Sequence, residues 1–336
     1  MKLRKIAAFA ISTVMCAFTF AGCGAGSPAT TTAAVQETTT AAETTEATTE
    51  ATTAAAPETT AAAAAEPTED DTSADKPVIL TVSFGTSYND SREKTIGGIE
   101  NAIQAANPDY EVRRAFTSQI IIDKLKERDG LEIDNVTEAL DRAVADGITE
   151  LVVQPTHLMH GFEYTDLQDE LEKYTDKFDK VVMGEPLLNS DDDFSRVADV
   201  LAEDTADYID GKTAVVFMGH GTEADSNEIY AQMQGVFDEK ELADYYVGTV
   251  EAEPSLDDVI AAIDGKGYTR VVLEPLMVVA GDHANNDMAG DEDDSWKSIL
   301  TNEGYEVECI LEGLGQKEGV QEIYAEHVQD AIDSIG

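Results

Sequence analysis

The feature of this sequence that most constrains its fold is an internal repeat in the part of the chain after residue 75. The segment 83–86 (SFGT) returns as 217–220 (FMGH), and 151–155 (LVVQP) returns as 271–275 (VVLEP). Each copy forms or follows a short apolar run of the kind that makes buried β-strands. A chain that repeats such runs in the same order is expected to fold as two similar halves.

Strands and helices are expected to alternate through both halves, which predicts parallel sheets joined by right-handed crossovers. The predicted fold class is α/β, with two similar halves, 76–210 and 211–336, each a parallel sheet flanked by helices, and a central cleft between them. Ligands of open α/β sheets bind beyond the carboxyl ends of the strands, so the cleft is the expected site. The predicted strands are 78–84, 111–116, 151–156, 181–183, 214–218, 245–250, 271–276 and 307–311. The predicted helices are 92–106, 120–128, 136–146, 167–173, 228–237, 256–263, 296–302 and 321–335.

Two segments precede these halves. A basic start and an apolar run that ends at Phe20 predict a signal peptide over 1–22. Small residues directly before Cys23 resemble a lipoprotein cleavage site and predict lipid on Cys23, with an ordinary signal peptide or an uncleaved anchor as the alternative. Residues 23–75, mostly Thr, Ala, Glu and Pro, predict a disordered linker. The expected location is therefore extracytoplasmic, with a lipid anchor in the cell membrane.

The chain is strongly acidic, with 22 Lys and Arg against 68 Asp and Glu and a formal net charge of −46. Binding to phosphates needs basic surface, so nucleic acid is not expected as a partner. A negative field attracts cations, although solubility or adaptation to salt would explain the same composition. Only Cys309 of the three cysteines lies in the predicted halves, so no disulfide is expected there. The sequence leaves a homo-oligomer open.

Four of the five histidines follow predicted strands, where the sites of α/β folds form. His220 stands between Gly219 and Gly221, and the glycines allow a sharp turn that presents the imidazole. His283 stands beside Asp282, a carboxylate that could orient a ligating imidazole. A capped turn with an incidental histidine is the structural alternative for each.

The other histidines are weaker candidates. His157 and His160 would point to opposite faces of a strand, so we expect only one of them at a site. The loop end with His160 and Glu163 is the part that we expect to face the cleft. His327 lies in the last predicted helix, where a packed or solvated role is expected.

A metal site is the chemistry that these residue types favour. Glu251 ends a predicted strand, and with His220 and His283 it would complete an open transition-metal site of two imidazoles and one carboxylate. The three residues lie far apart in sequence, so their spacing alone does not establish the site. No Gly-x-Gly-x-x-Gly or Walker loop occurs, so no nucleotide is expected. There is no Gly-x-Ser-x-Gly elbow either.

Four segments carry a resemblance to a known family: 82–87 (VSFGTS), 114–118 (RAFTS), 217–221 (FMGHG) and, most specifically, 275–288 (PLMVVAGDHANNDM). In these segments the sequence resembles the anaerobic sirohydrochlorin cobaltochelatases, which are class II, ATP-independent chelatases. The resemblance covers nearly all of 76–336. It implies two similar α/β halves with the tetrapyrrole in the cleft, and insertion of Co²⁺, the substrate metal, into sirohydrochlorin in anaerobic cobalamin biosynthesis.

The resemblance also implies site residues. The metal ligands would be His220, His283 and Glu251, with Glu253 as a rival to Glu251. His220, His283 and Glu163 are the candidate catalytic residues. Imidazole and carboxylate ligands suit Co²⁺ and also Fe²⁺, Ni²⁺ and Zn²⁺. The candidate substrate-binding residues are Ser83, Thr86, Arg114 and His160.

Two consequences follow for this particular chain. Because sirohydrochlorin is a polycarboxylate, Arg92, Arg113, Arg114 and Lys124 would have to form a local basic patch on an acidic protein. Cobalamin precursors are made in the cytoplasm, whereas the signal predicts export. The alternative function is therefore an exported lipoprotein that binds a metal ion, haem or another tetrapyrrole for uptake.

Overall fold

The structure is a computed structural model in which residues 77–335 are described. Every structural statement below concerns these residues. The predicted signal peptide, the lipid on Cys23 and the linker therefore lie outside the described residues. Within 77–335, no helix combines the length and the hydrophobicity needed to cross a bilayer.

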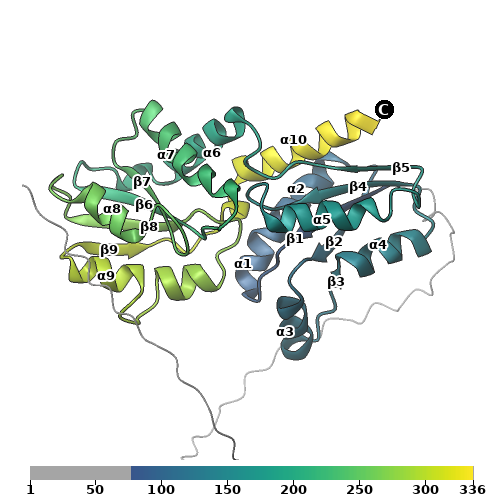
Figure 1. The fold of residues 1–336 in the computed structure, drawn as a ribbon, viewed down its shortest axis with the longest axis horizontal. Coiled ribbons are helices and arrows are strands. Elements are labelled where there is room, and N and C mark those ends of the chain that lie inside the picture. The colour runs from purple at the N-terminus through teal and green to yellow at the C-terminus, as the bar shows by residue number, and fades with distance from the viewer. Residues whose placement is uncertain (1–76, 336) are drawn as a thin grey trace, which may run out of the picture. The chain divides into compact units, whose positions relative to one another are not determined.

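The first sheet has five parallel strands in the order β3-β2-β1-β4-β5 (Figure 1). Helices connect these strands, as βαβ crossovers require. Its strands are β1 (Val78–Ser83), β2 (Glu111–Phe116), β3 (Asp134–Asn135), β4 (Glu150–Pro155) and β5 (Lys180–Met183). Its helices are α1 (Asn89–Lys94), α2 (Ile96–Ala106), α3 (Gln119–Asp129), α4 (Val136–Ala145) and α5 (Phe162–Glu172).

The second sheet has four parallel strands in the order β7-β6-β8-β9, so the predicted fold class of two similar α/β halves is confirmed. Its strands are β6 (Thr213–Gly219), β7 (Tyr245–Thr249), β8 (Arg270–Pro275) and β9 (Glu306–Cys309). Its α-helices are α7 (Glu228–Glu239), α8 (Leu256–Ile263) and α9 (Trp296–Asn302). A π-helix, η4 (Ala284–Met288), and the 3₁₀ turns η2 (Ala206–Tyr208), η3 (Asp225–Asn227) and η5 (Leu314–Gln316) complete it.

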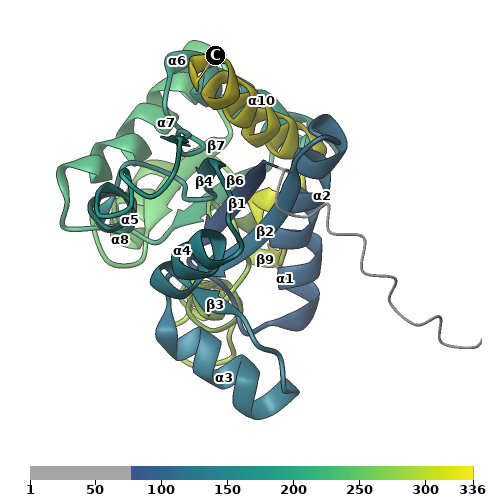
Figure 2. The same cartoon turned by 90° about the vertical axis from the view of Figure 1, so that its right-hand side faces the viewer.

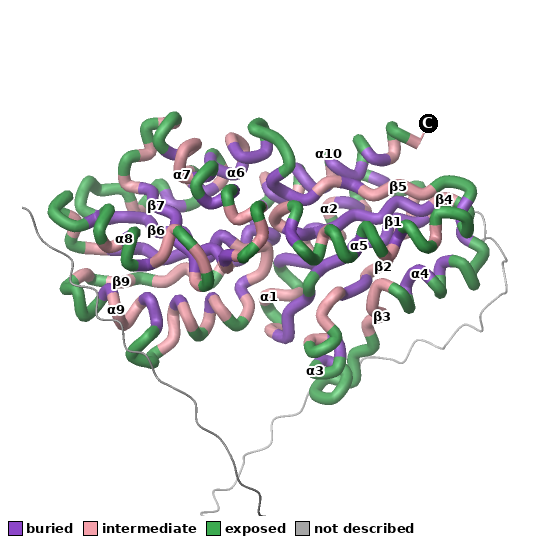
Figure 3. The backbone as a smooth tube through the Cα atoms, in the orientation of Figure 1, coloured by how far each residue is buried: buried purple, intermediate pink, exposed green. Residues whose placement is uncertain are grey.

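The central strands β1 and β6 are buried along their whole length, because helices cover both faces of a parallel sheet (Figure 3). Successive side chains enter different cores. In β6, Val216 and Met218 pack into a core of the second sheet, whereas Val215 and Phe217 enter a core that also contains Ile79 of β1. The shared core joins the two sheets.

Two helices differ from the sequence prediction. Helix α6 (Asp191–Asp204) was not predicted, although Ser190 and Asp193 form a capping box at its start and Phe194 and Val197 belong to its buried stripe. Helix α10 (Glu318–Ile335) belongs to the second half in sequence but packs against α2, β4 and β5 of the first sheet (Figures 1 and 2). The predicted boundary at 210/211 therefore separates the sheets but not the helices.

Smaller differences concern element ends. The predicted helix 92–106 is two helices, α1 and α2, which meet at Thr95. Helix α5 begins at Phe162, earlier than the predicted 167, and the short strand β3 was missed. The remaining predicted strands and helices are present with ends that shift by a few residues.

The loops at the carboxyl ends of the two sheets meet each other. Tyr88, after β1, approaches Asp282, after β8, with 3.4 Å between the phenol oxygen and the carboxylate. The loop after β4 approaches the loop after β6, since a Cβ built on Gly161 would lie 3.9 Å from Ser226 Oγ. Side chains at these strand ends are thereby gathered into one region of the molecule.

Candidate metal centre

His220 is the first residue after the central strand β6. A Cβ on Gly221 would lie 2.8 Å from the backbone nitrogen of Ala252, and Gly221 has a φ of 86°, so only glycine suits this turn. The His220 Nδ1 lies 2.7 Å from the Gly221 carbonyl oxygen. The tautomer that donates this hydrogen bond leaves Nε2 with its lone pair free for a metal ion.

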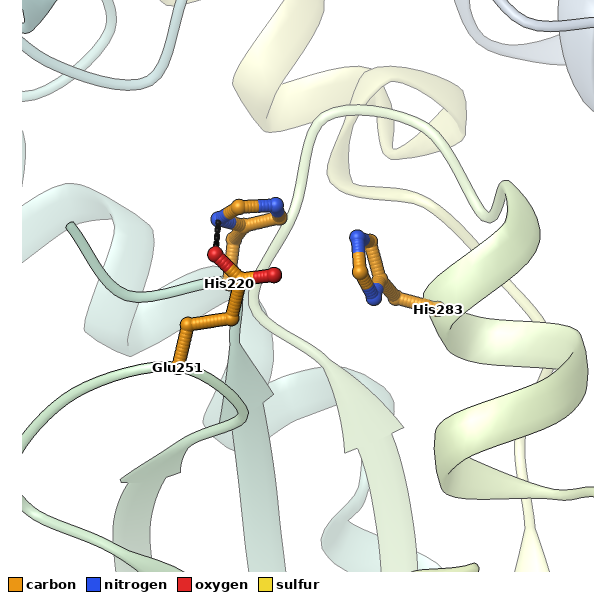
Figure 4. A group of neighbouring side chains, drawn as sticks. All are labelled: His220, Glu251 and His283. Carbon is orange, nitrogen blue, oxygen red and sulfur yellow. Dashed lines mark ion pairs between the residues drawn. The ribbon is translucent and has the colours of Figure 1, made fainter. Parts of the chain in front are cut away.

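Glu251 is placed by the backbone of the neighbouring strand. Its N–H donates to the His220 carbonyl at 2.9 Å, which continues the pairing of β7 with β6 beyond the sheet. The Glu251 Oε2 lies 3.9 Å from His220 Nδ1 (dashed line in Figure 4). The carboxylate therefore stands beside the imidazole at the end of β7.

His283 follows β8 and directly precedes the π-helix η4. Its Nδ1 lies 2.8 Å from Asp287 Oδ2, four residues on. Asp282, the acid predicted from the sequence to orient this imidazole, does not do so: its carboxylate accepts from Tyr88 and Asn286 instead, and that prediction is wrong. One helical turn brings position i+4, rather than the adjacent residue, beside the ring. This bond again leaves Nε2 as the available ligand atom.

The structure brings His220, Glu251 and His283 together, and one ligand atom from each lies within 4.8 Å of the others (Figure 4). The two imidazole rings are perpendicular, with centroids 4.5 Å apart. The side chains are 46%, 57% and 32% exposed, in the order His220, Glu251 and His283. Two imidazoles and a carboxylate in a site open to solvent can hold a divalent transition metal and still release it.

Glu253, the rival to Glu251, has other partners. Its carboxylate accepts from Ser255 N–H at 3.2 Å, and its backbone carbonyl accepts from Asn227. A hydrogen bond with Asp258 raises the pKa of the Glu253 carboxyl. Among the described residues, Glu253 is outside the group that could share a metal ion with the two histidines.

Two predicted substrate-binding residues are buried. The Ser83 hydroxyl lies 2.6 Å from the Thr156 hydroxyl and joins the ends of β1 and β4. Thr86 accepts from the Tyr88 N–H at 3.3 Å, and its Oγ1 lies 3.6 Å from a Cβ built on Gly281. Their side chains support the loops around the site.

His160, in the loop after β4, and Glu163, in the first turn of α5, are both exposed. That this end of the loop faces the cleft stays a prediction. His160 Nε2 lies 2.8 Å from Oε2 of Glu185, a residue that was not predicted at the site. Glu185 follows β5 in a Gly184-Glu185-Pro186 turn, and no spacing relative to His160 announces it. Only the pairing of β4 with β5 brings the two residues together.

The remaining histidines are packed. Burial lowers the pKa of His157 to about 4, so its ring is neutral and belongs to the interior. His327 on α10 is buried, and its Nε2 lies 3.3 Å from Asp193 Oδ1. These positions agree with the packed roles considered from the sequence.

Two arginines of the hypothesised basic patch are paired with carboxylates of the protein itself. Arg113 is paired with Glu111 and Asp146, and the Arg114 guanidinium makes a two-pronged ion pair with Glu100 on α2, so neither has a free charge for substrate. Lys94 and Lys124, in contrast, have no carboxylate oxygen within 4.0 Å among residues 77–335. They line a cavity of about 660 Å³ with Arg128, beside Ala280 and Asn285 of the His283 loop.

Comparison with known proteins identifies relatives over the whole described region. The family model described as "Cobalt chelatase (CbiK)" matches residues 77–333. The sirohydrochlorin cobaltochelatase of Salmonella typhimurium is 36% identical over 258 residues, which cover 77% of this chain and 97% of that protein. The sirohydrochlorin cobaltochelatase CbiKC of Nitratidesulfovibrio vulgaris is 31% identical over 262 residues, covering 77% and 92%.

Solved structures share the fold at lower identity. SirB from Bacillus subtilis with Fe³⁺ superimposes with a TM-score of 0.52 at 14% identity, over 77% of this chain and 97% of that one. The sirohydrochlorin chelatase SirB from Bacillus subtilis subspecies spizizenii in complex with cobalt gives 0.52 at 13% identity, over 77% and 96%. At these identities the likeness establishes the fold alone, which is chelatase-like.

Proposed function

The chain belongs to the cobalt chelatase (CbiK) family, and we propose that it is a sirohydrochlorin cobaltochelatase that inserts Co²⁺ without a nucleotide, in anaerobic cobalamin biosynthesis. One observation carries the proposal beyond family membership. His220, Glu251 and His283 come from the ends of three adjacent strands, and their ligand atoms lie within 4.8 Å of one another. The enzyme is thus a metal chelatase, a lyase, and Co²⁺ is one of its two substrates.

The ligand set suits a metal that is bound in order to be transferred. Three protein ligands leave coordination positions open, as in catalytic rather than structural sites. Each imidazole is oriented through Nδ1, by the Gly221 carbonyl or by Asp287, which leaves Nε2 as the nitrogen that can bind the ion. The exposure of all three side chains gives the ion a route in and gives the macrocycle access to it.

Basic side chains beside the centre match the carboxylates of the macrocycle. On a chain with a net charge of −46, the cavity beside the His283 loop gathers Lys94, Lys124 and Arg128. Asp90 and Glu312 also line it, and Arg128 is paired with Asp129, so the two lysines are its free cations among the described residues. Lysine ammonium groups without a partner carboxylate can neutralise carboxylates of the substrate. We assign this cavity, rather than Arg114, to the periphery of the macrocycle.

The location is a separate proposal that rests on the sequence before residue 77. We propose that Cys23 is lipidated after removal of 1–22 and that 23–75 tether the chelatase to the outer surface of the cell membrane. Mass spectrometry of the N-terminal peptide tests this, because a diacylglyceryl mass should be present on Cys23 and lost in Cys23→Ser. A mature N-terminal peptide that begins elsewhere than at Cys23, or that begins there without the added mass, would contradict it.

The test of the activity is spectroscopic. The purified protein is mixed with sirohydrochlorin and Co²⁺, and the visible spectrum is followed beside a sample without protein and beside the double variant His220→Ala/His283→Ala. We expect fast formation of the cobalt complex by the wild type alone. If the spectrum changes no faster than without protein, while Co²⁺ or haem binds stoichiometrically, the chain is instead a capture lipoprotein.

A further inference from the structure

Metal insertion requires proton acceptors that the metal centre does not supply. A free-base macrocycle loses two pyrrole N–H protons when one divalent ion takes their place. The lone pairs of His220 and His283 and the charge of Glu251 are engaged while the ion is held, so these groups cannot take the protons at that moment. The acceptors must stand elsewhere at the site.

His160 and Glu185 form the second imidazole–carboxylate pair near the strand ends. His160 Nε2 lies 2.8 Å from Glu185 Oε2, and the two side chains are 44% and 45% exposed. Tyr164 approaches both: its ring lies edge-on to His160 with centroids 4.5 Å apart, and its hydroxyl donates to Glu185 Oε2 at 3.4 Å. Burial and the charge of Glu185 raise the pKa of Tyr164 to about 12, so the phenol keeps its proton and stays a donor. With Nε2–H donated to Glu185, the Nδ1 of His160 is an acceptor open to solvent.

A buried side chain holds the backbone of Glu185 in place. The side chain of Gln154, fully buried at the end of β4, donates through Nε2 to the Pro155 carbonyl at 2.9 Å and to the Glu185 carbonyl at 2.8 Å. A Cβ on Gly184 would collide with Gln154 Oε1, so a glycine is needed for this close approach. The position of Glu185 is therefore fixed by a buried amide rather than left to a free loop.

His160 stands in the loop after β4, which meets the metal-centre loop of the other sheet. Gly161, next to His160, adjoins Ser226, and the segment from His220 to Asn227 is the loop that begins with a metal ligand. The sheet that carries the pair is not the sheet that carries the ligands. The loop with His160 and the loop that begins with the metal ligand His220 are therefore in contact, so a macrocycle held at the metal ligands would lie next to both.

Glu185 also borders a second cavity. A space of about 420 Å³, lined by Glu185, Asp192, Asp193 and His327 among others, lies between β5, α6 and α10. It is polar and large enough for several water molecules. A proton that reaches Glu185 can thus be passed to solvent on the side away from His160.

On the basis of the proposed function, we propose that His160 accepts one pyrrole proton during metal insertion and that Glu185 is its positioning residue. His160 Nδ1 takes the proton as the N–H bond breaks, and the electron pair of that bond stays on the pyrrole nitrogen, which binds Co²⁺. The imidazolium is stabilised by the Glu185 carboxylate and then loses its proton to solvent, directly or through the second cavity. The second pyrrole proton goes to Glu163, the exposed carboxylate in the first turn of α5, directly after this loop.

The test compares turnover with binding in His160→Ala and Glu185→Gln. We expect kcat to fall about 100-fold in the first variant, at the lower end of general-base contributions, and less, about tenfold, in the second, where the base itself remains. The dissociation constants of Co²⁺ and of sirohydrochlorin, measured separately by fluorescence or absorbance titration, should stay within twofold of the wild type. Added imidazole should restore part of the kcat of His160→Ala, which a merely structural role would not allow.

Glu170→Gln is the matched control, because it removes another carboxylate of the α5 region that is paired with Lys173. It should leave kcat unchanged. Wild-type kcat in His160→Ala, or a loss of rate that imidazole does not restore and that follows weaker macrocycle binding, would overturn the proposal. A wild-type protein without chelatase activity would instead overturn the proposed function, and with it this role of His160.

Discussion

At the end of its central strand, the first half of the repeat places Thr86 where the second half places His220, and Glu163 stands where the second half has His283. After the edge strands, Glu185 corresponds in register to the exposed Leu311. The scaffolds match, since β1 lies between β2 and β4 as β6 lies between β7 and β8. The second half thus holds the candidate metal ligands, while the first half holds acids, a histidine and their supports. In the proposed mechanism, one sheet therefore binds the ion, and the other binds the macrocycle and accepts its protons.

The largest effect should come from removing a metal ligand, and its counterpart in the first half provides the contrast. His220→Ala or His283→Ala should weaken Co²⁺ binding by more than about 100-fold, beyond what is typical for a partner outside the ligand set. Glu163→Gln, at the position that corresponds to His283, should bind Co²⁺ and the macrocycle like the wild type but turn over slowly. Calorimetric titration with Co²⁺ measures the first effect and stopped-flow absorbance the second. If Glu163→Gln lost as much Co²⁺ affinity as the histidine variants, the proposal that only the second half binds the metal ion would be wrong.

Within the second half, two neighbouring carboxylates should differ. Glu251→Gln should lower Co²⁺ affinity by about 100-fold, because the amide oxygen keeps the shape of the ligand but loses its charge. Glu253→Gln should have no effect on this affinity, since Glu253 bonds to Ser255 and Asp258. Titration of both variants with Co²⁺ separates the two residues. The reverse ranking would make Glu253 the ligand.

The two halves also differ at a buried position near the end of the strand, and this difference should make the free energy of unfolding depend on pH. Gln154 on β4 corresponds to Glu274 on β8, a fully buried carboxylate 2.7 Å from the Lys317 ammonium. Burial raises the pKa of Glu274 to about 7 from its ordinary 4.5. Between these two values the unfolded chain loses a proton that the folded protein keeps, so the free energy of unfolding falls as pH rises through this window.

The free energy of unfolding should fall by about 2–3 kcal/mol from this one group. Glu274→Gln, which places in the second half the glutamine found at position 154 of the first half, should not show this fall. Urea unfolding of both proteins at pH 5 and pH 7.5 gives the difference between their losses. Parallel losses in the two proteins would mean that Glu274 stays charged, held by Lys317.

The smallest of these effects concerns orientation of a ligand. Asp287→Asn should weaken Co²⁺ binding about tenfold, because the amide holds the His283 ring less firmly than the carboxylate 2.8 Å from Nδ1. Asp282→Asn, which changes the acid next to His283 in sequence, should leave Co²⁺ affinity unchanged. An effect of Asp282→Asn as large as that of Asp287→Asn would restore the adjacent acid as the orienting group.

The sequence by itself determined the two α/β halves, the residue types of the metal centre and the family. The apolar composition of runs such as 78–84 and 214–218 indicates that they are buried. The repeat of SFGT as FMGH places a polar residue at the same strand end in both halves. The Ser190–Asp193 capping box and the stripe from Phe194 to Leu201 would also have revealed α6. These signals are local, so they can be read without knowing any partner.

The tertiary structure alone decided which side chains meet. The pairing of β4 with β5 brings His160 beside Glu185. The side chain that orients His283 is Asp287 rather than Asp282, and Arg114 is neutralised by an ion pair with Glu100. Helix α10 also packs against the first sheet, although it follows the second sheet in sequence. The physical reason is that a hydrophobic pattern records how deeply each residue is buried, whereas partners depend on strand order and helix packing between segments far apart in the chain.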